Sequence, residues 1–241
     1  MARAALGMSF ALASRQSVLR TSNCQAWRSC GKIVSDCKRP EETSCWNCKD
    51  AVECTKQFFC DSCHTIQPPP DSQNLFEYMG LPVTYRIKDS ALKKRFRELQ
   101  FNLHPDKFAQ ASEQEKKLSD EHARRLNESY KTLSEPLLRA KYLLKILGGE
   151  ETNGLDLDES SLLEMMEWRE RVAEMSTSTE LRAEAEAVQK EIDVLLGELD
   201  KLFERKDLDA VRVNITKLSY LYSLSKQIDD RLETMRISEV E

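Results

Sequence analysis

Four cysteines in the N-terminal third of the chain have the spacing of a metal site. They form two Cys-x-x-Cys pairs separated by eleven residues: Cys45 with Cys48, and Cys60 with Cys63. Each tight turn of this kind brings two thiolates to one ion, and two turns complete a tetrahedral site. One zinc ion is the expected cofactor, and iron in a rubredoxin-like site is the alternative. Because four protein sulfurs leave no open coordination position, the expected role is structural.

Two further residues near these pairs carry side chains that can bind metal. Cys54 lies between the pairs and is spare, and His64 adjoins Cys63 as an alternative ligand, although the four cysteines suffice. Unliganded cysteines are the other interpretation of the pattern, and disulfides are less expected in a reducing compartment.

The second group of residues with chemical potential is His104-Pro105-Asp106. Proline fixes its own φ and biases the residue before it to an extended conformation. The loop therefore presents His104 and Asp106 in a defined way. A catalytic His–Asp pair is the alternative, but no recognisable motif supplies a nucleophile or a third group. We therefore expect no catalytic residues and no enzyme activity.

Amphipathic helices are expected on both sides of this loop. Before it, apolar residues at helical spacing mark one face of the segment that starts at Ser90: Leu92, Phe96, Leu99 and Leu103. The other face is basic and suits a partner with an acidic surface; it carries Lys93, Lys94 and Arg97. Asp89 or Ser90 is the expected N-cap. A capping box at Ser112 then starts the second helix, which predicts an antiparallel hairpin.

The pattern over the rest of the chain predicts an all-α protein with a four-helix and a three-helix domain. Pro136 suits the first turn of the last helix in the first domain. A capping box at Thr177 starts a heptad-patterned helix that is expected to be bundle core, with a self-associating coiled coil as the alternative. The predicted segments are 40–66 for the cysteine module, 67–73 for a Pro-rich linker, 74–148 and 157–241 for the helical domains, and 149–156 for the linker between them.

The first helix of the three-helix domain has two apolar faces. One is an ordinary core stripe of Met165, Trp168, Val172 and Met175. The other combines apolar and acidic side chains: Leu162, Leu163, Met166, Glu167 and Glu170. A three-helix bundle cannot easily bury both, so we expect the second face to be an exposed protein-binding patch, with a loop-side core position as the alternative. Tyr220, on the last helix, points nearly opposite Val211 and is expected to be exposed.

The N-terminal residues 1–39 have the composition of a mitochondrial transit peptide. They contain arginine, serine and apolar residues, and the first acidic residue is Asp36. A disordered basic tail is the alternative. The net charge of −5 implies no general affinity for nucleic acid. No apolar run approaches the roughly 18 residues that span a bilayer, so we expect no membrane partner.

Residues 74–147 resemble a J domain along their whole length, because the His-Pro-Asp loop lies between two amphipathic helices. The segment Pro136-Leu137-Leu138-Arg139-Ala140-Lys141-Tyr142-Leu143-Leu144 and the residues after it are similar to HscB, the J-domain co-chaperone family of iron–sulfur cluster biogenesis, in its mitochondrial form. The resemblance extends over roughly residues 45–241. Animal members of that family carry an N-terminal tetracysteine module.

The resemblance implies a role for each group of residues. The loop and the basic face, His104, Pro105, Asp106, Lys93, Lys94 and Arg97, would stimulate the ATPase of a mitochondrial DnaK-type chaperone. The patch on the first bundle helix, with Tyr220 as an added aromatic, would bind the iron–sulfur scaffold protein. Recipient apo-proteins are further expected partners. The expected location is the mitochondrial matrix, with a cytosolic pool of uncleaved protein in addition. The rival functions are a metal-handling or electron-transfer protein and a general J protein for unfolded clients.

Overall fold

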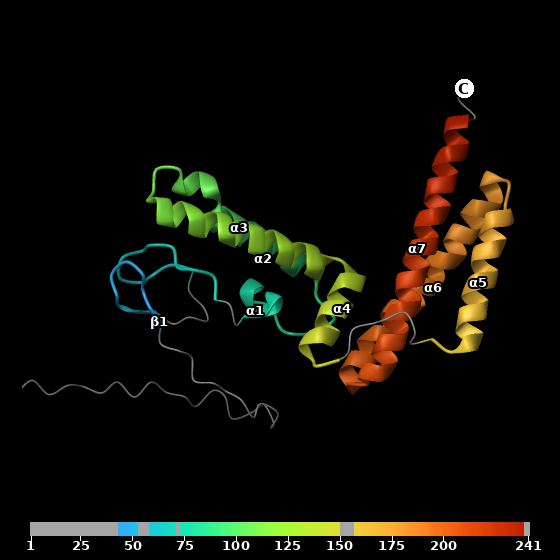
Figure 1. Cartoon of the computed structure of the whole chain (residues 1–241), viewed down its shortest axis with the longest axis horizontal. Helices are drawn as coiled ribbons and strands as arrows, with labels where there is room; N and C mark the ends of the chain where they lie inside the picture. The colour runs from blue at the N-terminus through green and yellow to red at the C-terminus, as the bar shows by residue number, and fades with distance from the viewer. Residues whose placement is uncertain (1–42, 53–57, 71–72, 150–156, 239–241) are drawn as a thin grey trace, which may run out of the picture. The chain divides into compact units, whose positions relative to one another are not determined.

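Helices dominate the part of the chain that the computed structural model describes, which is residues 43–52, 58–70, 73–149 and 157–238 (Figure 1). The predicted transit peptide, Cys54 and most of the linker 149–156 lie outside these residues. The helices are α1 (Leu75–Met79), α2 (Asp89–Leu103), α3 (Glu113–Ser134), α4 (Pro136–Ile146), α5 (Glu159–Glu174), α6 (Ser178–Arg205) and α7 (Leu208–Ser238). The prediction of an all-α fold is confirmed, with one small addition. Strands β1 (Thr43–Ser44) and β2 (Ala51–Val52) form a short antiparallel ladder in the cysteine module.

The predicted hairpin is present, and α2 packs along α3 (Figure 1). Leu92, Leu99 and Leu103 are buried in its core, and the partly buried ring of Phe96 lies 4.3 Å from that of Tyr130. The expected stripe on α2 is therefore its core face. Between the two helices, a short 3-10 helix, Pro105–Phe108, contains most of the loop.

Most of the predicted helix ends are confirmed, but one is wrong. Ser112 forms the expected capping box with Glu115, and Thr177 forms the one that starts α6. Neither Asp89 nor Ser90 caps α2, because Lys88 occupies the N-cap position without a side-chain hydrogen bond. Asp89 instead lies in the first turn, where its negative charge favours the positive end of the helix dipole.

The C-terminal helices form the expected bundle, in which α6 packs along α7 and α5 contacts α7. Of the predicted α5 stripe, Met165 and Val172 are buried in the core, whereas Trp168 and Met175 are only partly buried against it. The core also contains residues that the sequence patterns did not single out: Phe203, Leu221 and Leu224. Helix α4 also packs on α7, and the ring of Tyr85 stacks on Phe203 with centroids 5.2 Å apart. All described residues lie in one compact unit, Glu41–Glu241. Among them, no helix is both long and apolar enough to cross a bilayer.

Candidate functional site

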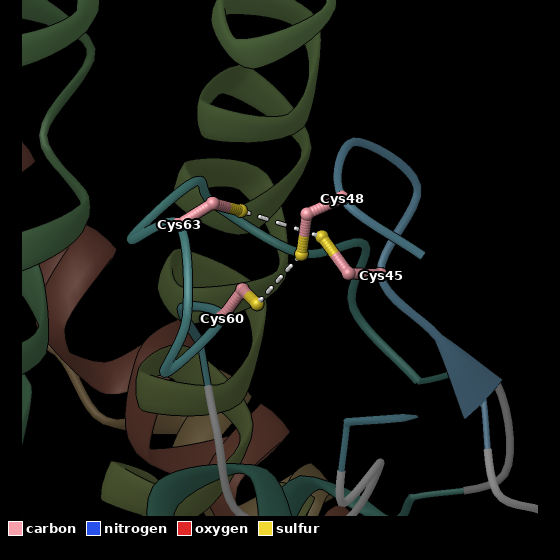
Figure 2. Close-up of side chains that lie close together, drawn as sticks. All are labelled: Cys45, Cys48, Cys60 and Cys63. Carbon is pink, nitrogen blue, oxygen red and sulfur yellow. Dashed lines mark hydrogen bonds between the residues drawn. The ribbon is translucent and has the colours of Figure 1, made fainter. Parts of the chain in front are cut away.

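The four predicted ligands of the metal site lie together, although eleven residues separate the two pairs (Figure 2). The sulfurs of Cys45 and Cys63 are 3.6 Å apart, as are those of Cys48 and Cys60, and all four lie within 4.8 Å of one another. Tetrahedral zinc with bonds of about 2.3 Å would place its sulfurs about 3.8 Å apart. The donor set and its spacing therefore fit a metal ion. Within the described residues, His64 is not part of this group.

Two matching turns hold the cysteines in place. The main-chain N–H of Lys49 donates to the carbonyl of Cys45 over 3.0 Å, and that of His64 donates to Cys60 over 2.9 Å. Lys49 and His64, each directly after the second cysteine of its pair, both have positive φ, 65° and 57°. Each turn is closed by an antiparallel backbone pair whose two residues are seven positions apart in the sequence: Ser44 with Ala51, and Phe59 with Ile66. The repeated geometry aims both pairs at one point.

Polar groups around the sulfurs favour the thiolate form on one side of the cluster. Burial raises the pKa of Cys45, but N–H groups of Cys48 and Asn47 outweigh it and bring that pKa down to about 5. The side chain of Thr65 lowers the pKa of Cys63. On the other side, the N–H of Asp50 lowers the pKa of Cys48, but burial and the neighbouring thiols raise it to about 12. A divalent cation would displace the protons that remain.

The His-Pro-Asp loop presents its polar groups outward at the end of the hairpin. The Nδ1 atom of His104 accepts a hydrogen bond from the main-chain N–H of Asp106 over 3.2 Å, so the imidazole caps the 3-10 helix that starts at Pro105. The Asp106 side chain is 90% exposed, and its carboxylate lies 3.5 Å from the same nitrogen. His104 thus fixes the turn, while Asp106 is free to contact a partner.

The basic face of α2 is exposed, as expected for Lys93, Lys94 and Arg97. Phe101 continues this face toward the loop, because it lies one helical turn after Arg97. Its side chain is 70% exposed, and the Nζ atom of Lys107 lies 3.4 Å from the centre of its ring. Phe101 is not among the residues that the sequence patterns singled out. Its position outside the core stripe of α2 was the signal that could have identified it.

The apolar patch on α5 is exposed, as predicted. Leu162, Leu163 and Met166 are 43%, 54% and 58% exposed. The carboxylate-bearing residues Glu167 and Glu170 are exposed on the same face. Meanwhile Met165 and Val172 point into the bundle core. One short helix therefore presents an apolar surface with an acidic rim to solvent.

The expectation that Tyr220 is exposed is wrong. Its ring is half-buried against the bundle core, and its hydroxyl donates a hydrogen bond to the main-chain carbonyl of Met165. Burial raises the pKa of this hydroxyl. Helical phase alone pointed the side chain away from Val211, but α5 packs across that side of α7. Tyr220 thus supports the helix turn that precedes Met166.

Residues 157–229 match the family described as the HSCB C-terminal oligomerisation domain. A mouse protein named iron-sulfur cluster co-chaperone protein HscB is 36% identical over 191 residues, covering 76% of this chain and 80% of the mouse protein. This chain belongs to the HscB family. A human protein with the same name as the mouse protein is 33% identical over 196 residues, covering 76% of this chain and 80% of the human protein.

Solved HscB structures have the same fold. The crystal structure of human co-chaperone protein HscB matches with a TM-score of 0.75 at 30% identity, over 78% of this chain and 98% of the human one. The chaperone HscB from Vibrio cholerae matches with a TM-score of 0.61, also at 30% identity, over 68% and 99%. The chain is therefore an iron–sulfur cluster co-chaperone of HscB type by sequence and by fold.

Proposed function

We propose that this protein is an adaptor between two others. The bundle binds the iron–sulfur scaffold protein through the α5 patch, and the hairpin stimulates the ATPase of a DnaK-type chaperone through the His104–Asp106 loop. The observation that carries this proposal is the presence of two exposed surfaces of opposite character, one on the α2–α3 hairpin and one on the C-terminal bundle. One is the basic face of α2 with the exposed Asp106 carboxylate in the loop after that helix, and the other is apolar with an acidic rim.

Each surface suits one step of the proposed cycle. The patch of Leu162, Leu163 and Met166 offers apolar area that becomes buried when the scaffold binds. Lys93, Lys94 and Arg97 guide the hairpin to an acidic surface of the chaperone, where Asp106 then makes a directed contact. ATP hydrolysis takes place on the chaperone, which explains why this chain needs no catalytic residue. The chaperone's changed grip on the scaffold would then favour transfer of the cluster to recipient apo-proteins.

The direct test is the steady-state ATPase of a mitochondrial DnaK-type chaperone, measured with this protein, with the scaffold, and with both together. We expect stimulation by this protein and a larger rate when the scaffold is also present. A chaperone that hydrolyses ATP at the same rate in all mixtures would refute the adaptor function. Stimulation by unfolded peptide in place of the scaffold would favour a general J protein.

Phe101 should contribute to chaperone binding through its exposed ring. We expect Phe101→Ser to raise the concentration needed for half-maximal ATPase stimulation about tenfold, or about 1.4 kcal/mol, because exposed aromatic rings often anchor interfaces. The unfolding midpoint should stay the same, since the ring is not in the core. Val83→Ser is the matched control, because Val83 is also exposed but lies off α2. Equal effects of the two substitutions would contradict this role.

The metal site should hold one zinc ion per chain with a structural role. We expect protein purified under reducing conditions to be colourless and to contain one equivalent of zinc by elemental analysis. Cys48→Ser should remove most of that metal, because it replaces one of four thiolates. His64→Asn should retain it, and Asn tolerates the positive φ at that position. A coloured, redox-active protein would instead support iron and the electron-transfer alternative.

We also propose that the protein works in the mitochondrial matrix after removal of an N-terminal segment. The acid-free, arginine-bearing sequence before Asp36 supports this location. Mass spectrometry of the protein recovered from isolated mitochondria would show the new N-terminus, and an intact Met1 end in that fraction would contradict it.

A further inference from the structure

The residues between the cysteine module and α1 do not behave as a simple spacer. Ile66 and Gln67 are both buried, and Ile66 belongs to the same apolar core as Phe76 and Tyr78 of α1. The indole N–H of Trp46 donates to the carbonyl of Ile66 over 2.7 Å. The module therefore continues into the J-like domain through packed, hydrogen-bonded residues.

Gln67 contacts both sides of this junction. On the module side, its Nε2 donates to the sulfur of Cys45 over 3.3 Å and to the carbonyl of Thr65 over 3.0 Å. On the other side, the main-chain carbonyl of Gln67 accepts a hydrogen bond from Nε2 of His122, on α3, over 2.7 Å. An amide that donates to a metal-bound thiolate stabilises and orients that ligand, as outer-shell groups do in metal sites. Gln67 thus links a ligand of the proposed ion to the long helix of the hairpin.

His122 is fixed on all sides. Only 1% of it is exposed, and its Nδ1 lies 2.9 Å from the hydroxyl of Tyr78. Since Nε2 donates to Gln67, Nδ1 must accept from that hydroxyl in the neutral tautomer. Burial lowers the pKa of His122, which agrees with a neutral ring. The ring of Phe58, from the module, packs edge-on against both the Tyr78 and the His122 rings, with centroids 5.6 and 5.5 Å away.

The same stretch of α3 also holds the start of the His-Pro-Asp loop. Ser119 lies one turn before His122 and is completely buried. Its hydroxyl donates to the carbonyl of Leu103 over 3.0 Å. Leu103 is the last residue of α2, directly before His104. A continuous series of contacts therefore runs from Cys45 through Gln67, His122 and Ser119 to the residue before the loop.

We infer that metal occupancy of the cysteine module stabilises the loop-bearing end of the hairpin through Gln67, His122 and Ser119. The module is then a brace for the J-like domain. The inference rests on the metal site of the proposed function, but it does not depend on the chaperone or the scaffold. Linkage makes it testable, because any free energy by which the metal stabilises the His122 contacts must also appear as tighter metal binding when those contacts are present.

The first experiment measures Zn²⁺ affinity by competition with a chelator under reducing conditions. We expect His122→Phe to weaken Zn²⁺ binding about tenfold, within the usual range of coupling between two sites. This substitution retains a ring but removes the donor to Gln67, while the Tyr78 hydroxyl retains the carbonyl of residue 122 as an acceptor at 3.2 Å. His64→Asn, next to a ligand but outside this series of contacts, and His104→Gln should both retain wild-type affinity. Equal affinity of His122→Phe and wild type would overturn the inference.

The second experiment needs no variant and covers the case in which His122→Phe does not fold. Hydrogen exchange of the wild-type chain is followed with Zn²⁺ bound and after its removal by chelator. We expect removal to speed exchange about tenfold around Ser119–His122 and from Leu103 to Phe108, and to leave the middle of α6 unchanged. Unchanged exchange rates in the first two segments would overturn the inference that the metal stabilises this end of the hairpin. If wild-type protein binds no Zn²⁺ at all, the metal site itself fails, whereas either negative result above leaves the adaptor function standing.

Discussion

His104→Gln is expected to reduce the proposed stimulation of a chaperone ATPase at least tenfold while leaving the α5 patch unaffected. The imidazole of His104 accepts the main-chain N–H of Asp106 and so fixes the turn that carries the exposed carboxylate. Glutamine is longer and more flexible, so the turn loses its cap and no longer holds the backbone of Asp106 in place. We expect at least a tenfold drop in the stimulated rate, about 1.4 kcal/mol of transition-state stabilisation on the chaperone. The measurement is single-turnover ATP hydrolysis at saturating concentration of this protein.

Two further substitutions separate capping from recognition. Asparagine is a good helix cap, so His104→Asn should retain the turn, and its unfolding midpoint should match that of wild type. If it also fails to stimulate, the imidazole itself contacts the chaperone. Lys190→Ala, which removes a charge from the exposed face of α6, is the control for Lys94→Ala. Only Lys94→Ala should reduce stimulation, and the effect should shrink at high salt. Full activity of His104→Gln would exclude the proposed role of the loop.

The fold could be predicted well because its signals are local. The stripe of Leu92, Leu99 and Leu103 and the capping box at Ser112 each depend on residues within a few positions of one another. The cysteine pairs could also be predicted, because each turn is encoded within its own Cys-x-x-Cys segment. Their meeting across the gap was inferred from the chemistry of a shared ion, and the structure brings the four sulfurs together.

Three of the residues that sequence patterns misjudged make their decisive contacts with residues far away in the chain. His122 looks like an ordinary polar position on α3, yet the module buries it. Tyr220 was placed by helical phase alone, which cannot account for the packing of α5 across α7. Gln67 was assigned to a linker because of the prolines after it, although its side chain reaches Cys45. In each case the partner is 20 or more residues away, beyond the range of any periodicity.

Replacing Leu162 and Met166 by serine is expected to weaken scaffold binding about 100-fold. Each side chain is about half exposed in the free protein, so each still has apolar area to bury in a complex. Burying such side chains fully is worth about 1.5–3 kcal/mol each, and roughly 3 kcal/mol together corresponds to the expected loss. The free protein should unfold at the wild-type denaturant concentration, because neither residue is in the core. Isothermal titration calorimetry with the cluster-loaded scaffold gives the affinity.

The matched control is Val194→Ser on α6. Val194 is 53% exposed, between Leu162 at 43% and Met166 at 58%, so it tests whether removing any exposed apolar side chain has the same effect. We expect its affinity to equal that of wild type.

Tyr220→Phe is the informative intermediate, because it removes only the hydroxyl bond to Met165 and should weaken binding severalfold by loosening α5. Wild-type affinity in the double serine variant would place the scaffold elsewhere. In the proposed cycle, the double serine variant should still stimulate the chaperone ATPase when no scaffold is present, but adding scaffold should no longer raise the rate further. His104→Gln should instead largely fail to stimulate the ATPase with or without scaffold.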